Sequence, residues 1–156
     1  MLTQRDVDRV AAQIAAGGLA WGDFAVKSVA PQEIAENVVA ADMALSFIPE
    51  TYSKQASSPT KIAEYLACGV PVVSTAGVGD IDSQITNQGI GVLIRSLSPE
   101  GYAEALTAVG PIVAAPDVAQ KCRDAALRLF DLATVGAPRY VALYDELLRA
   151  NRSAVA

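Results

Sequence analysis

The feature that most constrains the fold is the segment 59–75, PTKIAEYLACGVPVVST, where a short helical pattern, a glycine and an apolar run follow one another. Pro59 suits the first helical position, and Ser58 before it is a residue type that caps helices. Gly69 ends the helix, and Pro71 to Thr75 reads as a strand buried on both faces. This order is typical of parallel α/β sheets, in which helix N-termini beside strand ends receive anionic ligands.

The rest of the chain repeats this alternation of helices and short strands. We expect strands over 24–29, 43–48, 71–75 and 90–94. Helices are expected over 3–16, 31–41, 59–67, 80–87, 99–109, 116–134 and 138–151. Right-handed βαβ crossovers then give one three-layer, Rossmann-like α/β domain over residues 1–156. Its mainly parallel sheet has about four strands and is followed by C-terminal helices.

Composition excludes several classes of function. The net charge of −5 argues against nucleic acid, which needs a basic footprint. No run approaches the roughly 20 apolar residues of a transmembrane helix, and no export signal is visible. The absence of histidine excludes a Ser-His-Asp triad and histidine-ligated metal, and we expect no metal and no cofactor. Cys68 and Cys122 read as buried free thiols, which fits a cytoplasmic protein.

The start of the helix at Pro59 carries the best candidates for ligand binding. The N–H groups of Thr60 and Lys61 point out of the helix end, and Lys61 adds a full charge for an anion. Glu64 lies one turn further on the same face, where it could accept hydrogen bonds from ligand hydroxyls. Ordinary capping and a solvated Lys–Glu pair explain the same pattern, so spacing alone leaves both interpretations open.

Other candidates lie after the later strands. Gly77, Gly79 and Asp80 follow the strand 71–75, where the glycines permit close backbone approach and Asp80 can cap the next helix. Arg95 follows the last strand and could meet an anion at the same edge. Capping and plain surface exposure are the alternatives for these residues.

The segment SSPTKIAEYLACGVPVVST resembles the donor-binding part of GT-B glycosyltransferases of the group 1 type. The similarity continues through GVGDIDSQITNQGIGVLI and the closing RYVALYDELL, and the turn at 29–34 and the segment 41–45 also fit. The resemblance implies the C-terminal, Rossmann-like half of an enzyme that transfers a glycosyl group from a nucleoside diphosphate sugar to an acceptor.

The resemblance also implies roles for individual residues. Ser58, Pro59, Thr60 and Lys61 would bind the donor diphosphate, and Glu64 would bind the ribose hydroxyls. Val29, Ala30 and Pro31 would lie near the base. It identifies no catalytic residue.

The sequence departs from the family pattern at one position and in its length. Many family members carry a glutamate, associated with the sugar, where Ala56 stands here. The acceptor domain and the first two strands of the donor domain have no counterpart in these 156 residues, so we expect no turnover by this chain alone. The gap leaves an exposed, apolar sheet edge that favours a homodimer.

Three alternatives use the same residues differently. A non-catalytic nucleotide-binding or assembly module fits the loss of the glutamate at position 56. A fragment of a nucleotide-sugar epimerase shares the GT-B architecture, but the absence of histidine disfavours it. A flavodoxin-like receiver domain lacks the acidic pocket that it would need.

Overall fold

The computed structural model describes residues 4–49, 51–86 and 88–155, and the chain divides into two compact units, Met1–Ile34 and Ala35–Ala156. The first unit contains helix α1 (Gln4–Ala16) and the 3₁₀ turns η1 (Trp21–Asp23) and η2 (Pro31–Glu33). At η2 the Ala30 N–H donates to Glu33 Oε2 over 2.8 Å, which fixes the turn before Pro31.

The strand expected over 24–29 is wrong. Residues 24–30 are neither helix nor strand, and Phe24 is 40% exposed. An apolar, β-branched run becomes a strand only when a neighbouring strand satisfies its backbone groups. The described residues of the first unit contain no second strand to do so.

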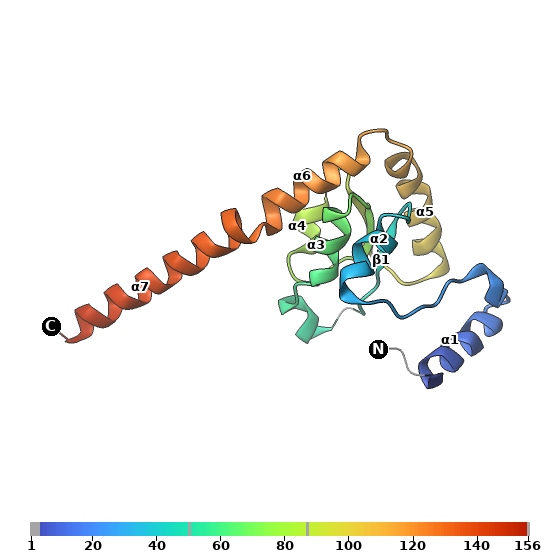
Figure 1. Ribbon diagram of the computed structural model, residues 1–156, viewed down its shortest axis with the longest axis horizontal. Helices are drawn as coiled ribbons and strands as arrows, with labels where there is room; N and C mark the ends of the chain where they lie inside the picture. Colours follow the sequence, from blue (N-terminus) through green and yellow to red (C-terminus); the bar gives the residue numbers. More distant parts are fainter. Residues whose placement is uncertain (1–3, 50, 87, 156) are drawn as a thin grey trace. The chain divides into compact units, whose positions relative to one another are not determined.

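The second unit carries the alternating elements in the expected order (Figure 1). They are α2 (Ile34–Val38, beginning at the last residue of the first unit), β1 (Ala44–Ser46), η3 (Tyr52–Ala56), α3 (Thr60–Ala67), β2 (Val72–Thr75), α4 (Ile81–Ile85), β3 (Gly91–Ile94), α5 (Pro99–Val113), α6 (Val118–Phe130), the π-helical turn η4 (Leu132–Gly136) and α7 (Ala137–Val155). The end of the helix expected over 80–87 falls on Asn87, outside the described residues.

The sheet confirms the predicted α/β, Rossmann-like fold class. Its strand order is β1-β2-β3 and both pairs are parallel, with Ala44 opposite Val72 and Val72 opposite Gly91. The described residues form three strands in this sheet, where the sequence predicted about four. The difference is the segment 24–29.

Helices cover both faces of the sheet, which makes three layers (Figure 1). Ile62 and Leu66 of α3, Ile81 and Ile85 of α4, and Cys122 of α6 share one core with Val72. On the other face, Ala105 and Val109 of α5 pack with Val73 and Ile94. The strands are therefore buried between two apolar clusters, as their unbroken hydrophobic runs predicted.

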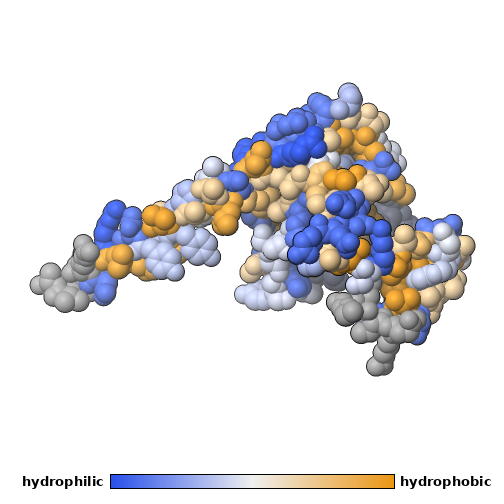
Figure 2. Space-filling model, in the orientation of Figure 1, coloured by the Kyte–Doolittle hydropathy of each residue, from blue (hydrophilic) through white to orange (hydrophobic). Residues whose placement is uncertain are grey.

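The C-terminal helices differ from expectation in their boundaries. The end expected at residue 109 for the helix over 99–109 is wrong, because α5 continues through Pro111 to Val113. Val109 and Val113 pack on the same cluster, so burial favours the extra turn although proline cannot donate a backbone hydrogen bond. Beyond η4, apolar side chains lie exposed along α7 (Figure 2).

Candidate functional site

The N-terminus of α3 begins one residue later than the sequence suggested. Pro59 stands at the N-cap position, and its carbonyl accepts from the Ile62 N–H at 3.1 Å. Ser58 was expected to cap the helix, but no side chain caps it, because Ser58 lies one position too early. Within the described part of the chain, the N–H groups of Thr60 and Lys61 have no hydrogen-bond acceptor. These two donors remain available to a ligand.

A depression of ≈ 380 Å³ opens beside this helix start. Pro59, Thr60, Lys61 and Tyr65 line one side, and residues 45–48 at the carboxyl end of β1 line the other. Sequence reasoning had named the first three of these α3 residues but not Tyr65. Its position four residues after Lys61, on the same helical face, was a signal that could have identified it.

The loops that follow β1 and β2 are packed together at this end of the sheet. The Gly79 N–H donates to the Lys54 carbonyl at 3.1 Å, and Gly79 adopts φ +54°. The Gly77 N–H donates to Asp82 Oδ1 at 2.9 Å. Asp80 stands at the N-cap position of α4, as expected, but its side chain makes no capping hydrogen bond. The glycine loop therefore supports the segment that leads into α3.

Two buried hydroxyls of β2 form hydrogen bonds with the backbone at the end of β1. Thr75 Oγ1 accepts from the Ile48 N–H at 3.1 Å, and Ser74 Oγ donates to the Ser46 carbonyl at 3.2 Å. Ser74 and Thr75 are both buried. These bonds continue the pairing past the last ladder position of β1 and hold one wall of the depression in place.

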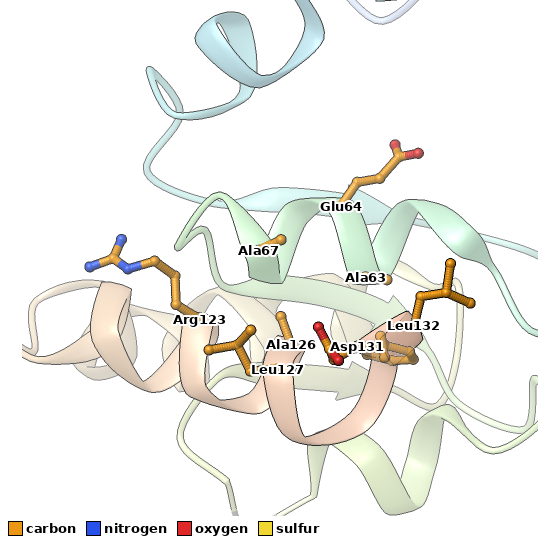
Figure 3. A pocket seen from close by; sticks show the side chains of 9 residues that line it. Ala63, Glu64, Ala67, Arg123, Ala126, Leu127, Asp131 and Leu132 are labelled. Carbon is orange, nitrogen blue, oxygen red and sulfur yellow. The ribbon is translucent and has the colours of Figure 1, made fainter. Parts of the chain in front are cut away.

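Glu64 does not share the depression of Lys61. It lies on the rim of a second, largely apolar groove of ≈ 490 Å³ between α3 and α6. Figure 3 shows its carboxylate pointing away from the α6 side chains. No ion pair joins Lys61 and Glu64 among the described residues. The two side chains are both exposed and therefore open to a ligand that spans this part of α3.

The second groove is lined by both small and charged residues. Ala63, Ala67 and Ala126 contribute small side chains, and Arg123 and Asp131 contribute charged ones. Asp131 accepts from both the N–H and the hydroxyl of Thr134, each at 2.7 Å. These hydrogen bonds lower the pKa of the Asp131 carboxyl. Asp131 is thus held ionised at the junction of α6 and η4.

The remaining candidates lie apart from the depression at Lys61. Arg95 follows β3 as expected, but it lines a separate depression with Ser96 and the start of α5. Ala56 is exposed at the end of η3 and brings no carboxylate to the site. Val29, Ala30 and Pro31 belong to the first unit, so their place near a nucleotide base stays a prediction.

The chemistry that this arrangement supports is anion binding. It combines two free N–H groups at a helix N-terminus, one lysine and the hydroxyls of Thr60 and Tyr65. Among the described residues, no group of histidine, cysteine or carboxylate side chains is arranged to hold a metal ion. None of the helices in the described part of the chain has the length and apolarity needed to cross a bilayer.

Comparisons with known proteins identify a similar fold. No protein-family model matches the sequence, and no curated protein matches it either. Among solved structures, a sucrose-phosphate synthase from Thermosynechococcus elongatus matches with a TM-score of 0.64 and 20% sequence identity. The match covers 94% of this chain and 34% of the synthase. The chain therefore has the fold of about a third of that protein.

Proposed function

We propose that this chain is the nucleotide-sugar-binding part of a glycosyltransferase. The reaction is transfer of a glycosyl group from a nucleoside diphosphate sugar to an acceptor. The observation that carries the proposal is the start of α3, where Lys61 and two N–H groups that have no acceptor among the described residues border a depression at the carboxyl end of β1. The likeness in fold to a sucrose-phosphate synthase supports it.

Each part of the donor has a proposed binding group. The backbone of Ser58, Pro59 and Thr60 and the ammonium group of Lys61 bind the diphosphate, and the helix dipole adds to the lysine charge. Glu64, one turn along α3, accepts hydrogen bonds from the ribose hydroxyls. The base lies toward Val29, Ala30 and Pro31. The assignments of the diphosphate and the ribose rest on the family resemblance and on residues exposed at the start of α3 and along it. The assignment of the base rests on the resemblance alone.

The proposed contribution to catalysis is electrostatic. When the glycosidic bond to the diphosphate breaks, negative charge develops on the leaving phosphate. The first-turn N–H groups stabilise that charge without moving, because α3 is fixed by its buried Ile62 and Leu66. Lys61 adds its charge from an exposed side chain. No acceptor-binding group is proposed within these residues, so the chain alone binds the donor and does not turn it over.

A non-catalytic nucleotide-binding module is the second candidate. The observation that favours it is Ala56, which replaces the carboxylate that the resemblance associates with the sugar. Such a module would bind nucleoside diphosphates and nucleotide sugars equally well, because nothing in it would contact the sugar. A donor-binding half would prefer at least one nucleotide sugar over its diphosphate.

Calorimetric titration tests both candidates. The chain is titrated with UDP, GDP and ADP and with their glucose conjugates. Replacement of Lys61 by alanine should weaken binding of every diphosphate by about ten- to a hundredfold, the range for a lost charge-assisted bond. Glu64→Ala should weaken the binding of nucleotides but leave the affinity for inorganic pyrophosphate unchanged, because pyrophosphate has no ribose.

Lys121→Ala and Glu104→Gln are the matched controls, because both residues lie away from the proposed site. Neither control should change the affinity. Absence of binding for every nucleotide, in a chain that is shown to be folded, would refute both candidates. Glycosyl transfer or donor hydrolysis by this chain alone would contradict the expectation that it is inactive in isolation.

A further inference from the structure

We propose that two copies of this chain associate through the outer edge of β1, in an antiparallel pair centred on Leu45. The reasons for this dimer do not include nucleotide binding, although Leu45 and Phe47 also line the depression beside α3. The sequence predicted a homodimer at an exposed sheet edge, and our proposal specifies the edge, the face and the register. β1 is an outer strand of the sheet, and Leu45 in its centre is 53% exposed.

The backbone of β1 offers hydrogen bonds on its outer side. The Ala44 N–H donates to the Pro71 carbonyl at 2.9 Å, and the Ile48 N–H donates to Thr75 Oγ1 at 3.1 Å. N–H groups alternate in direction along a strand, so those of Leu45 and Phe47 point away from β2. An outer edge of this kind is a template for another strand.

The side chains of the same residues border an apolar groove. Met43, Leu45 and Phe47 line it from the strand, and Tyr102 and Leu106 line it from α5, with no charged residue among them. Phe47 and Tyr102 meet edge to face, with ring centroids 5.7 Å apart. Leu106 is 62% exposed. A charged or strongly polar partner finds no complementary group here, so the occupant is an apolar strand.

The β1 segment itself has the required pattern. In an antiparallel pair with the two-fold axis at Leu45, each Leu45 lies opposite its copy, and Met43 lies opposite Phe47 of the partner. The three outward-facing residues then form hydrogen-bonded pairs, which exchange both N–H···O bonds. Because the axis is perpendicular to the sheet, all these side chains lie on the α5 face of both copies. Leu106 of each copy is brought toward the other.

The size of the patch limits the strength of the dimer. Stable interfaces bury roughly 800 Å² per partner, and transient ones lie below about 600 Å². Four side chains exposed by 39–62% and one short strand edge place this surface in the smaller class. We therefore expect a reversible monomer–dimer equilibrium at micromolar concentrations or above, and an isologous contact that closes at two copies.

Sedimentation velocity over about 1 to 500 µM chain tests the association, a range that brackets a micromolar Kd. The wild-type chain should shift from monomer to dimer as concentration rises. Leu45→Pro should weaken the dimer at least tenfold, because it removes an outward N–H, adds a ring at the axis and leaves the β1–β2 ladder bonds in place. Leu45→Asp should weaken it similarly by placing like charges opposite each other.

Leu147→Asp is the matched control, because Leu147 of α7 is 56% exposed but lies in a different apolar surface. This control should dimerise like the wild type. Cooperative urea unfolding of each variant shows that the fold is intact. A wild-type chain that stays monomeric at all concentrations overturns the proposal. So does a dimer that survives both Leu45 variants or that is lost in Leu147→Asp.

The register has its own test. In a chain with Cys68→Ala, which leaves the buried Cys122 as the native thiol, Leu45→Cys should give a covalent dimer with a short bismaleimide. Leu147→Cys should cross-link far less at the same concentration. Equal cross-linking of the two positions would show random collision and contradict an axis at Leu45.

Discussion

Gly79 lies so close to the backbone of Ser57 that a Cβ atom at position 79 would overlap the Ser57 carbonyl. The contact joins the loop after β2 to the loop that leads into α3, and the Gly79 N–H bond to the Lys54 carbonyl reinforces it. The N-terminus of α3 therefore depends on a glycine far from it in sequence. This relationship sets the geometry of the proposed diphosphate site.

Gly79→Ala should destabilise the chain and weaken nucleotide binding together. The substitution requires φ +54° in a residue with a side chain and forces Ser57 to move. We expect a loss of about 1–3 kcal/mol in the free energy of unfolding, the range for an enforced unfavourable backbone conformation. Urea denaturation measures the loss, and titration at a temperature where the variant is folded measures the binding.

Gly110→Ala is the control for that substitution and should raise the free energy of unfolding, whereas Gly79→Ala should lower it. Gly110 lies inside α5, and a Cβ there meets nothing within 4 Å. Alanine in a helix interior is more favourable than glycine by about 0.5–1 kcal/mol. A Gly79→Ala chain as stable as Gly110→Ala would show that the loop contact with Ser57 is absent in solution.

Thr75→Val should cost stability through one hydrogen bond. Thr75 is buried, and its hydroxyl accepts from the Ile48 N–H. Valine keeps the shape but leaves that N–H without its acceptor, so we expect a loss of about 1–3 kcal/mol. Thr107→Val on exposed α5 should stay within about 0.5 kcal/mol of wild type by the same urea measurement. Equal effects of the two substitutions would contradict the assigned bond.

The helices and strands that were predicted correctly have local causes. The helical spacing before Gly69 and the apolar run after it specify α3 and β2, because each pattern buries the right side chains by itself. The strand expected over 24–29 failed because a strand needs a neighbour, which local sequence does not supply. Pro111 was misjudged for the same reason, since packing of Val109 and Val113 outweighs the local preference.

The candidate site was predicted in part. The helix start at 59–61 is encoded locally, and its residues border the depression at the end of β1, while their role in ligand binding stays a prediction. The hydrogen bonds that hold the surrounding loops were not predicted. Asp82 accepts from Gly77 and Thr75 accepts from Ile48 through contacts that only the fold creates. Whether Glu64 and Lys61 act on one ligand depends on that ligand spanning α3, which residue spacing does not determine.

The two cysteines should differ sharply in reactivity. Burial raises the pKa of the Cys122 thiol to about 11, whereas Cys68 is partly exposed. The thiolate is the reactive form, so Cys122 is almost wholly protonated and inert at neutral pH. Iodoacetamide at pH 8 should label Cys68 and leave Cys122 unlabelled until urea unfolds the chain. Mass spectrometry of chymotryptic peptides measures both, and early labelling of Cys122 would contradict its burial.

The same pKa predicts a loss of stability at high pH. The folded thiol holds its proton to about pH 11, whereas the unfolded thiol releases it near its ordinary value of 9.0. Below pH 9 the thiol is protonated in both states, and the contribution of Cys122 to the free energy of unfolding is fully present. Between pH 9 and 11 the unfolded state binds fewer protons, so stability falls as pH rises. The Cys122→Ala chain should show a shallower fall in urea titrations over this range.

Helix α7 should exchange its amide hydrogens much faster than α6 in the isolated chain. Every described side chain of α7 up to Asn151 is exposed, including Tyr140, Tyr144 and Leu148, whereas Cys122, Ala125 and Ala126 of α6 are buried. A helix without tertiary packing is only marginally stable in water, so its amides open locally. Hydrogen exchange followed by mass spectrometry compares the two helices directly in one sample. Protection of α7 equal to that of α6 would mean that another surface covers its apolar face in solution. If that protection persisted in Leu45→Asp, the covering surface would be separate from the β1 dimer.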